Sequence, residues 1–431
     1  MRSLESHKVK SLAFEMLDEI SAGKMERSLK DFSKISFGSK GVSRLAYSTL
    51  ERESHQYFSD YMSKLGLTVW TDSVGNTLAQ YPATQDESLP FLATGSHLDS
   101  VPEGGAYDGI VGVVASMEIA RVLSESGATL KRPWRFIVFA AEEGARFGQA
   151  CNGSRAIAGL TDMQELEKLL DSNGTSLAQA MRELNFEPAR IKDAEWNAGD
   201  CFGFIELHIE QGNVLETESL SVGIVNIISG SQRLLVTVTG VSAHSGGTPM
   251  PLRKDALLTA AKAIVAVDSY AREARNAGIR ITVGRITTLP GSITTVPGWV
   301  QFSVDIRDFE IDRQERVVED LSCILIETGK TNGTDVSIEP IGCTSPIKLS
   351  SRIIEIIEQV SVVLDMKSTI LPSGASHDCQ QISRIADAGL IFVASKAGHS
   401  HMPDEFSSVK DIVLGTRLLF ASLLELDCNT L

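Results

Sequence analysis

The segment PWRFIVFAAEEG, residues 133–144, is an apolar run that ends in two adjacent glutamates, Glu142 and Glu143. The apolar part predicts a buried strand. Two like charges at the end of such a strand repel each other and are costly unless a positive group neutralises them. An arginine, a solvated loop or a metal ion could reduce this cost. The residues around the two glutamates allow a choice among these three.

The neighbouring segments predict an α/β sheet. Residues 90–100 (PFLATGSHLDS) and 202–212 (FGFIELHIEQG) predict strands. Residues 108–127 (DGIVGVVASMEIARVLSESG) predict a mostly apolar helix that stops at Gly127. Strands and helices in alternation indicate parallel strands that are covered by helices.

With 431 residues the chain is too long for one typical core, so we expect two domains. Residues 222–338 have the order β-α-β-β-α-β of a ferredoxin-like unit, with Asp255 as the expected N-cap of its first helix. We therefore predict one domain from residues 1–221 and 339–431, interrupted by an inserted domain. The larger domain should have a mixed, largely parallel sheet with helices on both faces.

Charge and composition exclude several classes of protein. A formal net charge of −15 argues against a nucleic-acid or anionic-membrane surface, which needs a basic patch. No uncharged apolar run is long enough for a transmembrane helix, and the first residues lack the apolar core of a signal peptide. The six cysteines form no CxxC pair, so we expect a cytoplasmic protein in a reducing compartment.

Histidines and carboxylates collect at the ends of the predicted strands. His97 and His208 end two apolar segments, and the Glu142–Glu143 pair ends a third. Open α/β sheets build their sites at the carboxyl ends of strands, so we expect these side chains at one edge of the sheet. Each residue alone has an ordinary structural explanation, but their coincidence at strand ends favours a metal site.

The loop SHLDSVPEGGAYDG, residues 96–109, adds Asp99 and Asp108. Its glycines let the chain fold back, so that Asp108 can approach His97. Imidazoles and carboxylates together suit Zn²⁺, Mn²⁺ or Co²⁺ better than Ca²⁺ or Mg²⁺. Asp99 could accept a hydrogen bond from the second ring nitrogen of His97 and fix its tautomer.

A second metal ion would explain the adjacent glutamates. In a two-metal site one carboxylate bridges the ions, and each ion needs further ligands. Adjacent residues point in different directions, so one glutamate can bind metal while the other acts as a general base toward water. The residues alone leave open which glutamate has which role.

Five segments resemble the amidase–hydantoinase–carbamoylase branch of the dimetal aminoacylase/carboxypeptidase superfamily: TGSHLDSVPEGGAYDG (94–109), AAEEGARFG (140–148), ELHIEQGNVLE (206–216), GVSAHSGGTPM (240–250) and SHMPDEFS (400–407). This branch contains N-carbamoyl-L-amino-acid hydrolases, allantoate and ureidoglycolate amidohydrolases and β-ureidopropionases. The motifs follow the family's order and are specific for the family, but not for the substrate.

The resemblance implies a zinc-peptidase-like catalytic domain that binds two divalent ions (Zn, Mn or Co). It implies that Glu142 is the general base and that Asp99 orients His97. It also implies five metal ligands: Asp108 as the bridge, His97 and His208 at one ion, and Glu143 and His401 at the other. The family's Ser-His-x-Pro pattern fits residues 400–403 and so selects His401 rather than His399. The peptidase branches usually have an acidic residue in place of His208, so the histidine favours an amidohydrolase.

The resemblance also implies substrate contacts. Gln211 would contact the substrate, and His244 would reach the active site of the partner subunit and stabilise the oxyanion. Gly374 and His377 lie in SGASHDCQQ (373–381), which resembles the family's glycine-rich substrate loop, where Cys379 is expected to be a packing residue.

Arg307 is the expected carboxylate clamp. In residues 299–308 apolar and polar side chains alternate, so the polar set should face away from the core. A guanidinium there can bind a carboxylate through two hydrogen bonds, although a surface salt bridge is the alternative. The family usually has an asparagine where this chain has Thr294, whose hydroxyl reaches less far, so we expect a difference in substrate recognition.

The expected function is hydrolysis of the ureido (carbamoyl) C–N bond of an N-carbamoyl amino acid or a similar ureido acid. The inserted domain is expected to act as a lid and to form a homodimer. The alternatives are a dimetal peptidase or deacylase that acts on N-acyl amino acids, an allantoate or ureidoglycolate amidohydrolase, and a metal-free binding protein. The glycines of 104–112 lack the GxGxxG and Gly-Lys-Ser/Thr patterns, which argues against a nucleotide-binding protein.

Overall fold

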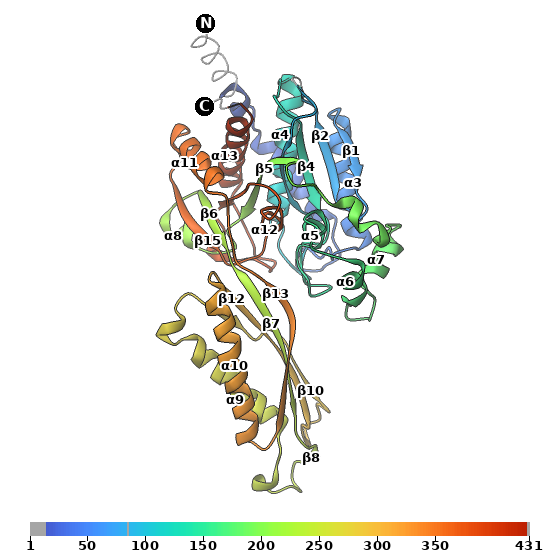
Figure 1. Cartoon of the computed structure of the whole chain (residues 1–431), viewed down its shortest axis with the longest axis vertical. Coiled ribbons are helices and arrows are strands. Elements are labelled where there is room, and N and C mark those ends of the chain that lie inside the picture. The colour runs from blue at the N-terminus through green and yellow to red at the C-terminus, as the bar shows by residue number, and fades with distance from the viewer. Residues whose placement is uncertain (1–13, 84–85, 429–431) are drawn as a thin grey trace. The chain divides into compact units, whose positions relative to one another are not determined.

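The computed structural model describes residues 14–83 and 86–428, which fall into two compact units (Figure 1). The first unit contains the described residues up to Asn226 and from Lys348 onward, and the second is Ile227–Ile347. Each unit has its own buried apolar core, and the two are described separately below. Among the described helices, none combines the length and the apolar character that a membrane-spanning segment needs.

The limits of the second unit differ from the expected 222 and 338. The strand β6 (Val222–Ile228) pairs with the large sheet of the first unit, so the chain leaves that sheet later than expected. The strand β13 (Asp335–Thr344) continues the small sheet beyond residue 338.

The first unit is built on a mixed sheet in the order β1-β2-β4-β3-β5-β16-β6-β14, with β15 beside β6. Its central strands are parallel: β4 (Trp134–Phe139), β3 (Phe91–His97), β5 (Cys201–Ile209) and β16 (Ala388–Val393). Strands at its two sides are antiparallel to their neighbours: β1 (Thr68–Thr71), β2 (Thr77–Tyr81) and β6. The short strands β14 (Ile347–Lys348) and β15 (Ser368–Ser373) extend it. The expected mixed, largely parallel sheet is confirmed.

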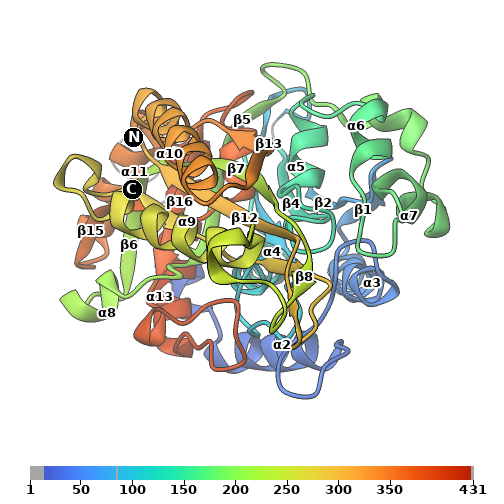
Figure 2. The ribbon, with the colours of Figure 1, turned by 90° about the horizontal axis from the view of Figure 1, so that it is seen from below.

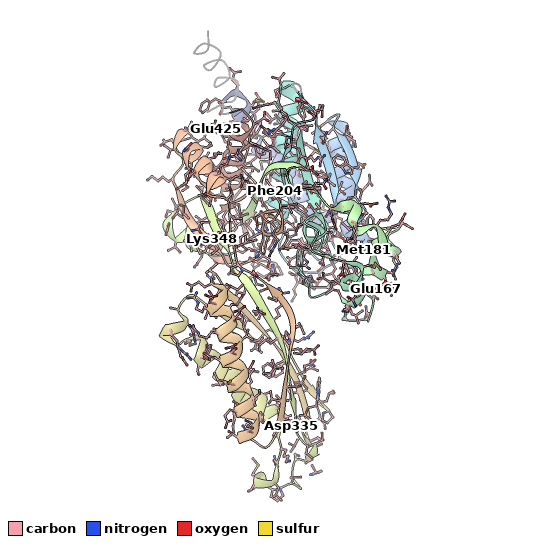
Figure 3. The ribbon with its side chains drawn as sticks, in the orientation of Figure 1. Glu167, Met181, Phe204, Asp335, Lys348 and Glu425 are labelled. Carbon is pink, nitrogen blue, oxygen red and sulfur yellow. The ribbon has the colours of Figure 1, made fainter. Side chains whose placement is uncertain are left out.

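Helices cover both faces of this sheet (Figure 1). One face carries the long helices: α2 (Ala22–Lys34), α3 (Thr49–Lys64), α4 (Ile110–Ser126), α11 (Ser351–Val363) and α13 (Val409–Cys428). The other face carries α12 (Asp378–Ile382), which contacts β5, β16 and α5 (Asn152–Ile157). Figure 3 marks β5 by Phe204, whose side chain is fully buried in the sheet.

The helix α4 packs on β3, β4 and β5, and all its residues from Ile110 to Leu123 are buried. Gly112 permits this approach, since a Cβ at this position would lie 2.3 Å from the carbonyl oxygen of Leu207 in β5. The helix ends as expected at Gly127, which has the left-handed conformation with φ 62°. The loop before α4 is thereby held against the carboxyl end of β5.

Several short elements had no counterpart in the sequence prediction. They are one or two turns long, too short to show an apolar period. They are α5, α6 (Met163–Lys168), α7 (Leu177–Glu183), α8 (Val214–Glu218), α12 and the 3₁₀ turns η1 (Pro188–Ala194) and η4 (Lys396–Gly398).

The second unit has the ferredoxin-like order of elements. Its sheet order is β10-β12-β7-β13, with β9 beside β12, and all pairs are antiparallel. The strands are β7 (Gly230–Thr239), β9 (Arg280–Thr282), β10 (Ile286–Leu289), β12 (Trp299–Asp308) and β13. The helices α9 (Ala256–Ala271) and α10 (Ile311–Thr331) lie side by side on one face (Figures 1 and 2).

Smaller features complete the second unit. The side chain of Asp255 caps α9 by accepting the N–H groups of Leu257 and Leu258, as expected. The second β position of the expected β-α-β-β-α-β order is occupied by two strands, β9 and β10, that pair with different parts of β12. A separate pair, β8 (Ala243–His244) with β11 (Thr295–Val296), and the turns η2 (Met250–Leu252) and η3 (Ala274–Asn276) lie outside the main sheet.

Candidate metal centre

Three neighbouring strands end at the candidate site. His97 is the last residue of β3, and His208 is the next-to-last residue of β5. Glu142 and Glu143 follow β4 after a turn in which Ala141 has a positive φ of 54°. Because the three strands are parallel neighbours, their carboxyl ends lie at one edge of the sheet, as the sequence predicted.

The carboxylate of Asp108 lies between two groups of side chains. Its Oδ1 is 3.4 Å from Nε2 of His97 and 3.1 Å from Nε2 of His208. Its Oδ2 is 3.4 Å from Nε2 of His401, and that nitrogen is 3.3 Å from Oε1 of Glu143. The structure thus brings together the five side chains that the resemblance implied as ligands, in two groups that share Asp108.

These separations fit the coordination of a divalent ion. Two ligand atoms bound at about 2.0–2.1 Å to one tetrahedral ion lie about 3.3 Å apart. The nitrogen–oxygen distances of 3.1–3.4 Å in both groups agree with that spacing. Imidazole nitrogens and carboxylate oxygens are donors that Zn²⁺, Mn²⁺ and Co²⁺ accept. Both groups therefore fit a divalent transition-metal ion.

The close contacts among these side chains shift the pKa values of the histidines and of Asp108. Burial lowers the pKa of His97, but hydrogen bonds to Asp108 and Asp99 outweigh it and raise the pKa well above its ordinary value. Burial raises the pKa of Asp108, but the neighbouring histidines, above all His208, hold it well below its ordinary value. His401 is less buried, and its contacts with Asp108 and Glu143 outweigh desolvation and raise its pKa to about 11.

These shifts predict that metal binding releases protons. A proton on His401 stabilises the metal-free fold fully below pH 6.5, and this stabilisation is lost as the pH rises toward about 11. Metal binding needs a neutral imidazole, so protons compete with the metal over the whole range from pH 6 to 8. Affinity for Mn²⁺ should rise roughly tenfold per pH unit for each proton displaced. Titration calorimetry in buffers of different ionisation enthalpy measures the released protons, and a binding enthalpy independent of the buffer would contradict this prediction.

Asp99 connects the first ligand group, which is His97, Asp108 and His208, to the turn after β4. Its carboxylate accepts the backbone N–H groups of Glu142 at 3.0 Å and of Glu143 at 2.9 Å. Nδ1 of His97 lies 3.1 Å from the backbone carbonyl of Asp99 and 3.4 Å from its carboxylate. The expected orientation of His97 therefore comes mainly from the carbonyl, while the side chain holds both glutamates, a contact that the sequence did not predict.

The remaining contacts of Asp108 come from two polar side chains. Gln211, which has a positive φ of 56°, donates from Nε2 to Oδ2 of Asp108 at 2.6 Å. The hydroxyl of Ser400 donates to the same oxygen at 3.0 Å. His208 donates from Nδ1 to the carbonyl of Ile209 at 2.9 Å, which leaves Nε2 directed at Asp108. Gln211 thus contacts the central carboxylate in addition to any contact with substrate.

Glu142 lies beside the first group. Its Oε2 is 3.8 Å from Nε2 of His97, and its Oε1 accepts a hydrogen bond from the thiol of Cys151 at 3.1 Å. Burial raises the pKa of Glu142 well above its ordinary value, although the charge of His97 opposes this shift. A carboxylate with a raised pKa is a better proton acceptor. The isolated position of Cys151 in the sequence gave no sign of this contact.

Behind His208 lies a second layer of buried polar groups. His377 is buried, packs edge-to-face on His208 with ring centroids 4.5 Å apart, and pairs through Nε2 with the hydroxyl of Ser373 at 2.8 Å. Glu206 accepts hydrogen bonds from Ser96 at 2.8 Å and from the N–H of Cys379 at 2.9 Å. The structure therefore places His377 in the wall that supports a candidate ligand.

Two further expectations concern the same loops. Cys379 is fully buried, and burial raises the pKa of its thiol well above the ordinary value, which agrees with a packing role. Gly374 follows β15 and precedes the buried His377. Among the described residues His401, and not His399, belongs to a candidate ligand group.

The second unit holds the other predicted residues. His244 is exposed on β8, and its Nδ1 accepts the N–H groups of Gly246 at 3.1 Å and of Gly247 at 3.0 Å. These bonds fix the tautomer that carries its proton on Nε2. The carbonyl of Thr294 accepts the N–H of Ser245 at 2.9 Å, and Thr295 pairs with His244. Thr294 and His244 therefore belong to one small two-stranded feature.

Arg307 lies on the polar face of β12, as the alternation predicted, while Val300, Phe302, Val304 and Ile306 are fully buried. Its Nε donates to Oδ2 of Asp305 at 2.8 Å. Oδ1 of Asp305 accepts from Nε of Arg233 at 3.2 Å. Asp305 thus holds two guanidinium groups on this face of the sheet.

Comparisons with known proteins agree with this architecture. The family model described as peptidase family M20/M25/M40 matches residues 93–425. A Paenarthrobacter aurescens protein named N-carbamoyl-L-amino-acid amidohydrolase is 36% identical over 411 residues, which are 95% of this chain and 99% of that protein. An Oryza sativa subsp. japonica protein named ureidoglycolate hydrolase is 32% identical over 389 residues, 89% of this chain and 80% of that protein. The crystal structure of AtUAH in complex with glyoxylate is similar with a TM-score of 0.90 and 31% identity, covering 96% of this chain and 99% of that chain.

Proposed function

This chain belongs to peptidase family M20/M25/M40, and on that premise we propose that it is a dimetal amidohydrolase. It would cleave the ureido C–N bond of an N-carbamoyl amino acid or a similar ureido acid. The observation that carries the proposal is the position of Asp108, whose two oxygens face separate ligand groups. The names of the relatives support the choice of a ureido substrate. His208 supports an amidohydrolase over a peptidase through the family resemblance alone, since the peptidase branches usually have an acidic residue there.

The family implies divalent metal ions, and we propose two of them, Zn²⁺, Mn²⁺ or Co²⁺, held by the five ligands. Asp108 would bridge them, with His97 and His208 at one ion and Glu143 and His401 at the other. When bound, such ions polarise a carbonyl group and make a water molecule more acidic. Asp99 would keep His97 and the two glutamates in position through its three contacts.

Glu142 would be the general base. Its buried carboxylate, with the raised pKa, would take a proton from the attacking water and later give it to the leaving amine. His244, whose Nε2 carries a proton, would donate to the developing oxyanion from the partner subunit. The products would be an amino acid or amine and carbamate, which decays to CO₂ and NH₃.

The second unit would supply substrate recognition and the dimer contact. It exposes large apolar side chains that a partner subunit could cover: Val241, Met250, Leu252, Leu258, Val265 and Ile293. We propose a homodimer through this unit in a cytoplasmic protein, with the unit acting as a lid. Sedimentation should therefore give twice the mass of one chain, and Ile293→Asp should shift it toward the monomer.

Arg307 would bind the carboxylate of the substrate, oriented by Asp305. Arg307→Ala should raise KM for carboxylate-bearing substrates by about 10–100-fold, because a charge-assisted bidentate contact contributes about 1.5–3 kcal/mol. Arg307→Lys is the matched variant, since it keeps the positive charge but loses the planar guanidinium with its two parallel donors. It should recover only part of the affinity for the substrate. Metal content should not change in either variant. An unchanged KM in Arg307→Ala would remove this residue from substrate binding.

A substrate panel tests the proposed function. The metal-loaded protein should release ammonia from at least one of N-carbamoyl-L-amino acids, β-ureidopropionate, allantoate and ureidoglycolate. Acetate release from N-acetyl amino acids, assayed in parallel, tests the deacylase alternative, and dipeptides test the peptidase alternative. Thr294 replaces the usual asparagine, so the Thr294→Asn variant should change the ranking within the panel. Hydrolysis of N-acyl substrates alone would reject the ureido proposal.

A further inference from the structure

The loop that carries Asp108 is held by an acidic residue outside the proposed chemistry, Glu405. Its Oε1 accepts the backbone N–H of Tyr107 at 2.9 Å and of Asp108 at 3.0 Å. Glu405 is only 4% exposed, although a carboxylate is rarely buried unless it has partners. Its contacts therefore fix the backbone of the residue that joins the two ligand groups.

The same carboxylate packs directly on the glycine that precedes this segment. A Cβ at Gly105 would lie 2.0 Å from Oε1 of Glu405, which is far inside van der Waals contact. Only glycine at this position lets the carboxylate approach both N–H groups. Gly105 is therefore required by its close contact with Glu405 as well as by the turn of the loop.

Glu405 also belongs to the segment that carries His401. Its own N–H donates to the carbonyl of Met402 at 3.1 Å, which closes a turn after the histidine, and His401 has a positive φ of 58°. Ser400, on the other side of His401, donates to Oδ2 of Asp108 at 3.0 Å. The segment from Ser400 to Glu405 therefore contacts Asp108 twice. Glu405 binds its backbone N–H and Ser400 binds its side chain, and the candidate ligand His401 lies between these two residues.

We propose that Glu405 is a positioning residue that sets the distance between Asp108 and His401, and thereby the affinity of the protein for its divalent ions. This inference rests on the proposed metal function, but it does not depend on the identity of the substrate. Glu405 acts through hydrogen bonds to backbone N–H groups, so the reach of its acceptor oxygen matters more than its negative charge. A glutamine keeps that reach and loses the charge, whereas an aspartate keeps the charge and loses the reach.

The test compares Glu405→Gln, Glu405→Asp and Glu405→Ala with the wild-type protein. The readout is the Kd for Mn²⁺, measured by competition with a chelating indicator after the metal has been removed. Glu405→Asp and Glu405→Ala should bind Mn²⁺ about 10–100-fold more weakly, the usual effect of losing a residue that supports a ligand, while Glu405→Gln should stay within about threefold of wild type. Turnover of Glu405→Asp should recover when Mn²⁺ is raised, which a general loss of folding would not allow.

Glu103 is the matched control, because it is an acidic residue of the same loop that binds other backbone groups. It accepts the N–H groups of Ser39, Lys40 and Gly41, and none of these belongs to a candidate ligand group. Glu103→Ala should bind Mn²⁺ as the wild-type protein does.

The pattern across the variants decides the outcome. Wild-type affinity in Glu405→Asp, with the fold confirmed by circular dichroism, would overturn the proposal. So would equally weak binding by Glu405→Gln and Glu405→Asp, since charge would then explain the effect. If the wild-type protein binds Mn²⁺ tightly but hydrolyses no ureido acid, the proposed substrate fails while the affinities still test Glu405.

Discussion

Glu142→Gln is expected to lower kcat by a factor of about 10²–10⁴, the usual contribution of a general base, while the bound metal is retained. The amide has nearly the same shape as the carboxylate but cannot take a proton from water. Glu142 lies 3.8 Å from His97 and outside both ligand groups, so its replacement should leave the metal affinity unchanged. Steady-state kinetics and elemental analysis of the same preparation give both quantities.

The adjacent residue is the control for this experiment. Glu143→Gln makes the identical chemical change one position along the chain, where the side chain faces His401 at 3.3 Å. It should weaken the binding of one metal ion, and its activity should recover in part at high Mn²⁺. Turnover that survives in Glu142→Gln would mean that Glu142 is not the general base. Loss of metal from this variant would mean that Glu142, and not only Glu143, is a ligand.

Asp108→Asn is expected to abolish high-affinity binding at both sites at once. Each oxygen of Asp108 belongs to a different ligand group, and an amide supplies no negative charge to either. A ligand at 100 times its Kd stabilises a folded protein by about 2.7 kcal/mol, so Mn²⁺ should raise the Tm of the wild-type protein and leave that of Asp108→Asn unchanged. Thermal unfolding with and without Mn²⁺ measures this difference.

Two histidines provide the comparison for Asp108. His401→Ala should lose one of the two ions, because His401 contacts only the Oδ2 group. His399→Ala, two residues away, should keep both ions. Equal loss of metal from Asp108→Asn and His399→Ala would indicate damage to the fold rather than removal of a ligand. Retention of both ions by Asp108→Asn would contradict the bridging position.

The parts of the site that lie on regular elements could be predicted from the sequence. His97, His208 and the glutamates follow apolar segments, and parallel strands bring the residues at their ends to one edge. Asp108 could be placed near them because glycines in its loop permit a return. The family resemblance then assigned His401, which lies far along the chain on a segment without regular structure.

The contacts that support these residues could not be predicted, because they join irregular segments. Glu405 binds the backbone N–H of Asp108, 297 positions away in the sequence. Every residue except proline has such an N–H group, so the residue type at 108 could not identify this contact. The side chain of Asp99 was expected to serve His97, yet it mainly holds two N–H groups in a turn set by Ala141 at positive φ. His377 was expected from the resemblance of its loop, but its edge-to-face contact with His208 depends on the packing of α12 on β5 and β16, which the sequence does not show.

In the proposed dimetal site, the carboxylate of Asp108 would bridge two divalent ions. Diffraction from crystals grown with Mn²⁺, recorded at the manganese absorption edge, tests it most directly. We expect two anomalous peaks about 3.5–4 Å apart, one beside His97 and His208 and the other beside Glu143 and His401. A single peak at the buried group of Glu206, His208 and His377, or no peak within bonding distance of Asp108, would contradict it.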